Sequence, residues 1–374
     1  MRLLHVHSGN LYGGVEALLL TLSRFREAAP LVQEFALCFD GRIADELRST
    51  GVQVHTLGEV RTRHPWTILR ARKRLRDLLR ERTFDAAACH MPWAQAIFGP
   101  IARAAGIPAI FWMHDIAQGR HWLERWSAQT APTLAICNSR YTALTLAKLY
   151  PRTPSEILYA PVALETAPFD DDQRIALRAS LGTAASMIVI VQASRFEPWK
   201  GHRDHLEALG RLTDLPGWEC WIVGGAQRPA EQKYRDGLRR RTTELGLDDR
   251  VRFCGQRSDV PQLLRAADIY CQPNTEAEPF GIVFAEALGA SLPIVTTGLG
   301  GVAELVDESC GLRVPPGNRA ALTAALRRLI TDAKLRECLG ATGIRRVEQL
   351  CDPARQIGRL NTILGSIAQP LHHR

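Results

Sequence analysis

The feature that most constrains the fold of this chain is an alternation of short apolar segments with helical patterns, which restarts once. In the first half, β-branched and apolar runs typical of buried strands occur at 3–7, 35–39, 52–57, 84–89, 109–114 and 133–138. Helical patterns between them occur at 15–25, 68–79 and 95–105. Alternation of this kind predicts a parallel sheet covered by helices on both faces.

The alternation begins again after a proline-rich stretch at 151–172, which we interpret as a linker containing one short strand. The second series of expected strands lies at 186–194, 218–225, 251–255, 269–273 and 293–297. A last helical segment spans 352–368, with no strand after it. The chain has 374 residues, enough for two domains. We therefore predict two α/β domains, each with its own sheet.

Composition and cysteine usage indicate a globular cytoplasmic protein. Hydrophobic residues make up 46% of the chain and charged residues 23%. No apolar run approaches the roughly 18 residues of a membrane-spanning helix. His5, His7, Ser8 and Asn10 interrupt the apolar start, so it does not resemble a signal peptide. The nine cysteines are scattered without a C-x-x-C pair, which argues against a disulfide framework or a zinc site.

Positive charge is concentrated in the first half of the chain. Of the formal net charge of +8, residues 1–165 carry +6, with 20 Lys and Arg against 14 Asp and Glu. The segment 70-RARKRLRDLLRER-82 has helical spacing that places Leu75, Leu78 and Leu79 inward and a basic face outward. One interpretation is that this basic face is an ordinary solvated surface. The other is that it binds an anionic membrane surface, at the inner face of the membrane, or a phosphorylated acceptor. No aromatic-plus-basic module accompanies it, which argues against nucleic-acid binding.

Polar residues of chemical interest follow the expected strands of the second half, where ligands bind in open parallel sheets. Glu278 and Glu286 flank Pro279-Phe280-Gly281, and a helix is expected to begin near Gly281 or Ile282. The free amides of such a helix start suit a diphosphate or sugar hydroxyls. Glu286 could then accept hydrogen bonds from a ribose, and Glu278 could face the sugar. The alternative is that both glutamates are ordinary helix-capping residues.

Two cations follow the strand at 186–194. Arg195 and Lys200 lie in a loop that ends with Gly201 before a helix, a pattern that fits neutralisation of a diphosphate leaving group. The alternative is a pair of ordinary surface charges. We expect Lys200 and Glu278 to lie in exposed loops, so that replacing either with alanine abolishes activity without unfolding the protein.

The N-terminal half offers weaker candidates at its strand ends. Gly13 and Gly14 precede a helix, where backbone can approach a ligand, but neither G-x-G-x-x-G nor a P-loop is present. His114 ends the strand at 109–114 and could bind a sugar or play a structural role, and His90 is a weaker candidate for the same region.

Together these segments resemble family 4 of the retaining glycosyltransferases, over nearly the whole chain. The resemblance is strongest where 278-EPFGIVFAE-286 reproduces the family's E-x7-E motif, and it extends to 194-SRFEPWKG-201 and the segment 251–273. It implies the GT-B fold, in which two Rossmann-like domains face each other across a cleft and the C-terminal helix packs back on the N-terminal domain. The implied domains are an acceptor-binding domain at 1–165, a nucleotide-sugar-binding domain at 166–350 and the returning helix at 351–374.

The resemblance also implies roles for individual residues. Arg195 and Lys200 would hold the donor phosphates, Glu286 the ribose, and Glu278 would lie by the reacting sugar. His114 would touch the sugar from the N-terminal domain. The other implied donor contacts are Gly13, Gly14, Gly255, Arg257, Phe280, Gly281 and Ile282. The stretch 158-LYAPVALE-165 departs from the N-G-V-D-like sequence of many members, which leaves the interdomain contact there undefined.

The implied reaction is retaining transfer of a hexosyl unit from a UDP- or GDP-linked sugar to a glycan or lipid-linked glycan acceptor, in polysaccharide or glycoconjugate biosynthesis. Same-face attack, with the departing phosphate helping to deprotonate the acceptor, is favoured over two-carboxylate catalysis. We expect no cofactor besides the donor and no metal, and we interpret 170-DDD-172 as a helix cap. An epimerase, a pyridoxal-phosphate-dependent phosphorylase and a non-catalytic nucleotide-sugar-binding protein are less favoured alternatives.

The acceptor is the least constrained part of the prediction. Trp122 and Trp126 would share a helix face, where they could stack on a sugar acceptor or contribute to the domain core. The excess of basic residues in the first half favours a lipid-linked glycan at the membrane as the acceptor. The alternative is a small-molecule acceptor.

Overall fold

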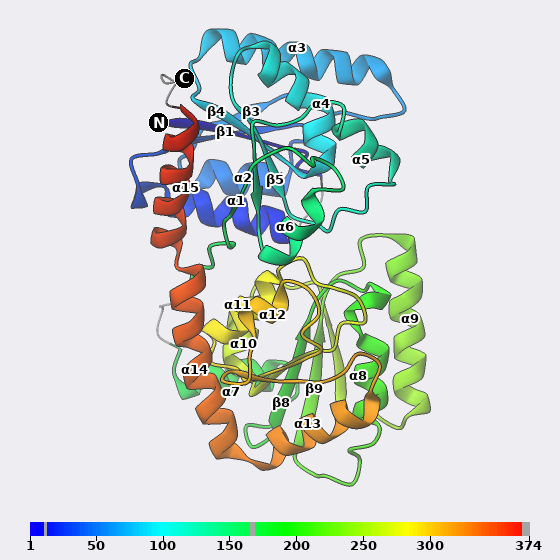
Figure 1. Cartoon of the computed structure of the whole chain (residues 1–374). Helices are drawn as coiled ribbons and strands as arrows, with labels where there is room; N and C mark the ends of the chain where they lie inside the picture. The colour runs from blue at the N-terminus through cyan, green and yellow to red at the C-terminus, as the bar shows by residue number, and fades with distance from the viewer. Residues whose placement is uncertain (11–12, 165–168, 369–374) are drawn as a thin grey trace. The chain divides into compact units, whose positions relative to one another are not determined.

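The computed structural model describes residues 1–10, 13–164 and 169–368 (Figure 1). Contacts between Cα atoms divide the chain into two compact units. The N-terminal unit comprises Met1–Ala163 and Cys351–Arg374, and the C-terminal unit comprises Leu164–Leu350. Each unit contains one parallel sheet, as the two strand–helix series predict. The predicted boundary between residues 165 and 166 lies outside the described residues.

The N-terminal sheet has seven strands in the order β3-β2-β1-β4-β5-β6-β7. Their bounds are β1 Arg2–His7, β2 Val32–Leu37, β3 Val54–Thr56, β4 Ala86–His90, β5 Ala109–Met113, β6 Leu134–Cys137 and β7 Ser155–Ile157. Every neighbouring pair is parallel. The short strand expected within the linker is therefore the edge strand β7 of this sheet.

Helices cover both faces of the N-terminal sheet (Figure 1). They are α1 Gly14–Arg24, η1 Arg26–Ala28, α2 Arg42–Ser49, α3 Pro65–Glu81, α4 Met91–Ala104, α5 Trp122–Ser127 and α6 Arg140–Leu146. Helices α3 and α4 pack on one face, against alternate strand residues such as Ala36 and Ala87. Helices α1 and α2 pack on the other, against Phe35 and Leu37. Successive strand residues thus face opposite layers, as in any sheet buried on both faces.

The C-terminal sheet has six parallel strands in the order β10-β9-β8-β11-β12-β13. The strands are β8 Ile188–Ala193, β9 Trp218–Val223, β10 Val251–Gly255, β11 Ile269–Gln272, β12 Ile294–Thr296 and β13 Gly311–Arg313. The last strand, β13, was not expected from the sequence. Its three residues, of which only Gly311 is buried, give almost no apolar pattern.

The helices of the C-terminal unit also form two layers. They are α7 Asp171–Ser180, η2 Pro198–Lys200, α8 His202–Leu209, α9 Pro229–Glu244, α10 Val260–Ala266, α11 Ile282–Gly289, α12 Val302–Leu305, α13 Arg319–Thr331 and α14 Ala333–Cys351. One core cluster joins α8, α9 and α13 to the sheet residues Ile190, Cys220 and Val295. On the opposite face, Phe284 of α11 packs edge-to-face on Tyr270 of β11, with ring centroids 5.3 Å apart.

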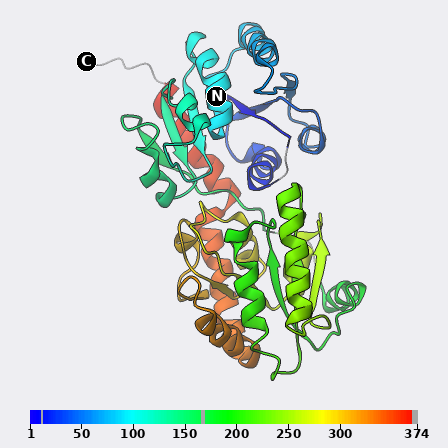
Figure 2. The ribbon, with the colours of Figure 1, turned by 90° about the vertical axis from the view of Figure 1, so that its right-hand side faces the viewer.

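Two smaller expectations can be checked against these elements. The Asp170 side chain accepts a hydrogen bond of 2.8 Å from the Gln173 amide, so 170-DDD-172 caps α7 as predicted. The last helix, α15 Pro353–Ala368 (red in Figures 1 and 2), packs against α1 and η1 of the N-terminal unit. No described helix is long and apolar enough to cross a membrane.

Both sheets reverse their strand order beside their first strand. In the N-terminal sheet β1 lies between β2 and β4, and in the C-terminal sheet β8 lies between β9 and β11. Loops that leave the carboxyl ends of such neighbouring strands run in opposite directions, which opens a crevice for a ligand. Gly13 and Gly14 follow β1, Lys200 follows β8 and Glu278 follows β11, so these candidate residues lie beside the two reversals.

Candidate active site

The two loops that carry Lys200 and Glu278 leave neighbouring strands of the C-terminal sheet. Lys200 follows β8 and Glu278 follows β11, on either side of the point where the strand order reverses. The Thr275 amide donates a hydrogen bond of 2.8 Å to the Trp199 carbonyl and ties one loop to the other. Residues 78 positions apart in sequence therefore meet at one end of the sheet.

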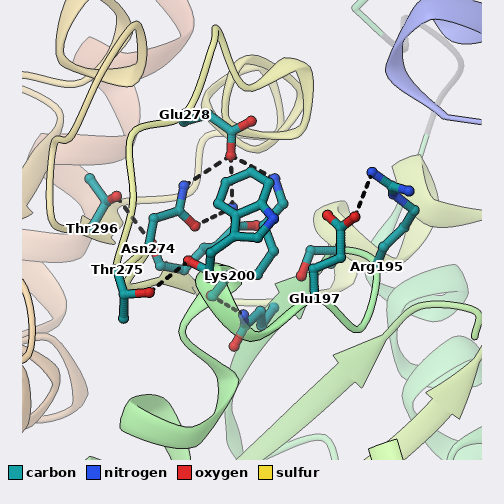
Figure 3. Close-up of polar contacts among 12 residues, drawn as sticks. Arg195, Glu197, Lys200, Asn274, Thr275, Glu278 and Thr296 are labelled. Carbon is teal, nitrogen blue, oxygen red and sulfur yellow. Dashed lines mark hydrogen bonds and ion pairs between the residues drawn. The ribbon is translucent and has the colours of Figure 1, made fainter. Parts of the chain in front are cut away.

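Lys200 and Glu278 form a buried ion pair (Figure 3). Lys200 Nζ lies 2.6 Å from Glu278 Oε2, and the two side chains are only 12% and 9% exposed. Lys200 Nζ also lies 3.9 Å from the ring centroid of Trp199, a cation–π contact. The prediction that both residues lie in exposed loops is wrong. Their loops fold back over the sheet end and bury the two charges against each other, so replacing one with alanine leaves the other buried and unpaired.

Further polar side chains bind the same carboxylate oxygen. Asn274 Nδ2 donates to Glu278 Oε2 at 2.9 Å, and Gln272 Nε2 donates to it at 3.3 Å. Gln272 also donates to Asn274 Oδ1 and accepts from the Tyr270 hydroxyl. The side chains of Tyr270, Gln272 and Asn274 are all fully buried in the fold. Sequence reasoning missed them, although polar residues that end a buried strand, as in 269-IYCQPN-274, are a usable signal.

Backbone geometry explains the two glycines of these loops. Gly201 has φ +76°, and a Cβ there would lie 1.9 Å from the Pro273 carbonyl oxygen, so only glycine fits. Gly281 has φ +90° and lies directly before α11, where a Cβ would meet the Phe284 ring at 2.6 Å. The predicted start of this helix near Gly281 or Ile282 is confirmed. Its first amides, including that of Ile282, have no intrahelical acceptor and are available to an anion.

Glu286 lies on α11 and differs from Glu278 in having no partner. No hydrogen bond or ion pair reaches its carboxylate within residues 1–10, 13–164 and 169–368. Burial raises the pKa of Glu286 from 4.5 to about 7. A half-buried carboxylate without a partner is a poor structural element and a good acceptor for ligand hydroxyls.

The two arginines among the predicted donor contacts of the C-terminal unit are engaged with carboxylates. Arg195 lies 3.0 Å from Glu197 and 3.8 Å from Glu231, and Figure 3 shows it apart from the Lys200–Glu278 pair. Arg257, two residues beyond Gly255 at the end of β10, donates from Nε to Asp259 at 2.7 Å. Both arginines therefore need to exchange or share a carboxylate before they bind a phosphate. Phe280 is buried beneath the start of α11.

In the N-terminal unit, Glu16 connects Gly13, one of the predicted donor contacts, to a buried histidine. The Gly13 amide donates to Glu16 Oε2 at 2.8 Å, and Glu16 Oε1 lies 2.7 Å from His7 Nε2. Gly13 has an extended backbone with φ −166°, and α1 begins at Gly14. Sequence reasoning missed Glu16, although a glutamate three residues after a helix N-cap is the spacing of a capping box. Leu11 and Tyr12, which precede Gly13 in sequence, lie outside the described residues.

His114 lies in a stack of aromatic rings at the end of β5. Its ring is nearly parallel to that of His90, with centroids 5.1 Å apart, and to that of Trp112, at 6.0 Å. His114 Nε2 lies 2.8 Å from His90 Nδ1. His90, the weaker of the two candidates from sequence, is thus completely buried behind His114 and cannot reach a ligand directly. Among the described residues, no cluster of histidine, cysteine or acidic side chains could hold a metal ion.

Comparison with known proteins identifies the class to which this fold and these residues belong. The family described as Glycosyl transferases group 1 matches residues 173–346, and the family described as Glycosyltransferase Family 4 matches residues 12–166. The two matches lie in the two Rossmann-like domains, one in each. The chain belongs to the family 4 glycosyltransferases, as its E-x7-E segment led us to expect.

Curated relatives and solved structures agree with this assignment. A D-inositol 3-phosphate glycosyltransferase of Jonesia denitrificans is 33% identical over 57% of this chain and 52% of its own length. The lipopolysaccharide core biosynthesis glycosyltransferase LpsE of Rhizobium meliloti is 32% identical over 44% of this chain and 46% of its own. The chain thus spans about half the length of the curated relatives it matches. Anabaena HepE, solved with UDP and glucose, has a TM-score of 0.86 at 24% identity, covering 98% of this chain and 100% of HepE, and shares the GT-B fold.

Proposed function

We propose that the chain transfers a hexosyl unit, with retention, from a UDP- or GDP-linked sugar to a glycan or lipid-linked glycan acceptor. The observation that carries this proposal is the contrast between the two glutamates of the E-x7-E segment. Glu278 is held by Lys200, Asn274 and Gln272, whereas Glu286 has a raised pKa and no partner in the described chain. Glu278 is an anion held beside the cation of Lys200. Glu286 is a hydrogen-bond acceptor without a donor, and the hydroxyl groups of a ribose would supply that donor.

The chemistry of the proposed reaction follows from charge. Departure of a nucleoside diphosphate develops negative charge on phosphate, and Lys200 with the amides at the start of α11 would stabilise it. Glu278 Oε2 already accepts hydrogen bonds from three side chains, which weakens this oxygen as a nucleophile toward the anomeric carbon. We therefore assign Glu278 an orienting role for Lys200 and for a sugar hydroxyl. The departing phosphate would take the proton of the attacking acceptor hydroxyl.

The experiment that tests the proposal is a thermal-shift series without added metal. UDP, GDP and ADP would be followed by their glucose, N-acetylglucosamine, galactose and mannose esters. UDP is the first choice because HepE, which shares the fold, was solved with UDP and with UDP-glucose. Stabilisation by one nucleotide series is expected in the wild type and not in Lys200→Met. The control Lys233→Met, at an exposed lysine of α9, should respond like the wild type.

Release of nucleotide from the donor in the presence of acceptors then separates an enzyme from a binding protein. Binding without turnover on any glycan, lipid-linked glycan or small alcohol would favour the non-catalytic alternative. Absence of a response to every nucleotide would contradict the donor site itself. The names of relatives guide the choice of acceptors, because they include lipopolysaccharide core transferases and a phosphatidyl-myo-inositol mannosyltransferase.

A small-molecule acceptor remains the second candidate, on account of α5. Trp122 and Trp126 lie on one face of this helix with ring centroids 6.3 Å apart, as the spacing predicts. Trp126 packs on the core of the unit, whereas Trp122 is 56% exposed and offers a ring face to a sugar or aglycone. Trp122→Ala should raise the KM for the true acceptor without changing the KM for the donor.

We further propose that α3 holds the protein at an anionic membrane surface. Leu75 is buried, as predicted, and Leu78 and Leu79 are partly buried, whereas Trp66 and Leu69 are 61% and 65% exposed. The exposed basic residues of the same helix are Arg70, Lys73, Arg74, Arg76 and Arg80. Exposed apolar side chains beside basic ones characterise helices that bind in the plane of the membrane interface.

Vesicle cosedimentation tests this surface. Binding to phosphatidylglycerol vesicles should exceed binding to phosphatidylcholine vesicles and should weaken with salt, because each cation near an anionic surface contributes about 1 kcal/mol. Trp66→Ser with Leu69→Ser should reduce it severalfold. Leu144→Ser, at an 80% exposed leucine of α6, is the matched control and should bind like the wild type. Equal binding to both kinds of vesicle would contradict an electrostatic role for α3.

A further inference from the structure

Three histidines and a glutamine form a continuous hydrogen-bonded chain across four neighbouring strands of the N-terminal sheet. Gln33 of β2 lies 3.0 Å from His5 Nε2, and His5 of β1 lies 3.0 Å from His90 Nε2 through its Nδ1. His90, at the end of β4, lies 2.8 Å from His114 Nε2 through its own Nδ1. The strand register places each member two residues beyond the partner of the previous one, so all four share one face of the sheet.

The donor and acceptor roles are fixed at the Gln33 end of this hydrogen-bonded chain. Gln33 Nε2 lies 3.3 Å from the carbonyl oxygen of Leu22 in α1. A carbonyl can only accept a hydrogen bond, so the amide nitrogen must face Leu22 and the amide oxygen must face His5. That oxygen can only accept as well, and therefore His5 carries its proton on Nε2.

The position of the proton on His5 determines the positions on the next two histidines, because all three rings are neutral. Burial lowers the pKa of His5 to about 4 and that of His114 to about 3. Burial, with the nearby histidines, also places the pKa of His90 well below 6.5. A neutral imidazole has one N–H, so His5 accepts at Nδ1 from His90 Nε2, and His90 accepts at Nδ1 from His114 Nε2.

The last ring is left with a bare Nδ1. His114 is partly exposed, whereas Gln33, His5 and His90 are buried. No hydrogen bond reaches its Nδ1 from any residue that the structure describes. We propose that Gln33, acting through His5 and His90, fixes His114 as the Nε2–H tautomer, so that His114 can only accept a hydrogen bond from a bound hydroxyl.

This assignment makes Gln33 a positioning residue that never touches a ligand. A sugar hydroxyl of the donor is the group that would donate to His114, and this part of the inference rests on the proposed function. Aldehyde, carbonyl or phosphate oxygens, which only accept, would be rejected at the same nitrogen. The tautomer itself is a property of the free protein and can be measured without any ligand.

Nitrogen NMR of protein labelled with [15N]histidine tests the chain. In the wild type we expect His5, His90 and His114 each to show a protonated Nε2 and a bare Nδ1, assigned through single substitutions. Gln33→Leu removes the fixed acceptor, and the His114 ring nitrogens should then shift toward the average of two tautomers. The donor KM should rise about threefold to tenfold, the value of one hydrogen bond, with kcat little changed.

Gln95→Leu is the matched control. Gln95 is equally buried and likewise donates to a carbonyl, that of Thr130 at 3.0 Å, but it lies on α4 outside the chain. It should change neither the His114 resonances nor the donor KM. If Gln33→Leu does not fold, His5→Phe breaks the chain at its second member and keeps a ring stacked on Phe35.

A proton on His114 Nδ1 in the wild type, or an unchanged His114 spectrum in the broken-chain variants, would overturn the inference. Loss of the tautomer in these variants would uphold the chain even if no nucleotide sugar were turned over. In that case the proposed function alone would fail, so the two results are separable.

Discussion

Each sheet carries a group of buried polar side chains that reaches its carboxyl end, but the two groups are built from opposite chemistry. In the C-terminal unit, a full charge is matched by another at 2.6 Å, and neutral amides complete the shell around Glu278. In the N-terminal unit, burial keeps three imidazoles neutral, and the hydrogen bonds between them carry direction and no net charge. Charge suits the binding of a phosphate that becomes more negative, whereas direction suits the discrimination of hydroxyl groups.

This difference predicts how each region responds to mutation. Removal of one member of an ion pair leaves a buried charge, which affects stability and function together. Removal of one member of a neutral chain leaves a single unsatisfied group and mainly changes which atom carries a proton. The predictions below test this contrast, beginning with the largest expected effect.

Lys200→Met should reduce transfer by more than about 100-fold, because the departing phosphate loses its cation. It should also lower the free energy of unfolding by about 3 kcal/mol, since Glu278 stays buried without its partner. Urea unfolding and initial rates measure the two effects separately.

The double variant Lys200→Met/Glu278→Gln separates the structural role of the pair from its catalytic role. It should regain at least half of the lost stability, because no unpaired charge remains, but it should regain no activity. A Lys200→Met protein as stable as the wild type would contradict the buried pair and support the exposed loops predicted from the sequence.

Glu286→Gln should weaken nucleotide binding and change its pH dependence. The pKa of about 7 means that the free protein holds Glu286 mostly protonated at pH 6 and mostly ionised at pH 8. If only the carboxylate binds the ribose, wild-type affinity should rise about tenfold between these values, in proportion to the competent fraction. The glutamine variant should bind weakly at both pH values. A pH-independent wild-type affinity, measured by titration calorimetry, would remove Glu286 from the ribose site.

The same substitution should have the opposite effect on stability. The pKa of Glu286 is higher in the folded protein than in the unfolded chain, so its contribution to stability is full below pH 4.5 and is lost as the pH rises to about 7. Glu286→Gln removes this loss and should make the protein more stable than the wild type at pH 8. A residue that stabilises a ligand at the expense of the fold is expected at a binding site.

Much of the fold could be predicted because its information is local. Apolar strands and amphipathic helices at their expected places gave both sheets, and only the short strand β13 had too few buried residues to be detected. The E-x7-E segment likewise placed Glu278, Gly281 and Glu286 correctly around the start of α11. Their spacing is set within one loop and one helix turn, so it can be read directly from the sequence.

The partners of the site residues could not be predicted, because they depend on strand order. Lys200 contacts Glu278 only because β8 and β11 are neighbours in the sheet. No pattern in the sequence between residues 200 and 278 indicates this strand order. The same neighbouring strands bury the Lys200–Glu278 pair. Alanine variants therefore cannot separate a loss of activity from a loss of stability. The histidine chain is a stronger case, since its four members come from four strands and their register decides whether they touch.

Glu16→Ala should produce a moderate effect in the N-terminal unit. It removes the acceptor of the Gly13 amide and the partner of His7, and loss of such a cap lowers stability by about 1 kcal/mol. The donor KM should rise severalfold as the backbone at Gly13 loosens. Glu16→Gln keeps an oxygen for either contact and should recover most of the stability. Wild-type kinetics in Glu16→Ala would show that the backbone at Gly13 does not contact the donor.

Gly13→Ala should have the smallest effect on the fold, and it compares the glycines of the two regions. The Gly13 backbone is extended, and an added Cβ would lie 3.7 Å from Glu16 Oε2, an ordinary contact. The free energy of unfolding should change by less than about 0.5 kcal/mol, as for surface sites without special geometry. Gly201→Ala, with its positive φ and its clash with Pro273, should instead unfold or strongly destabilise the protein. A raised donor KM in Gly13→Ala at unchanged stability would show that this glycine serves the ligand, as Gly201 serves the fold. An unchanged KM would mean that a methyl group at residue 13 meets no phosphate.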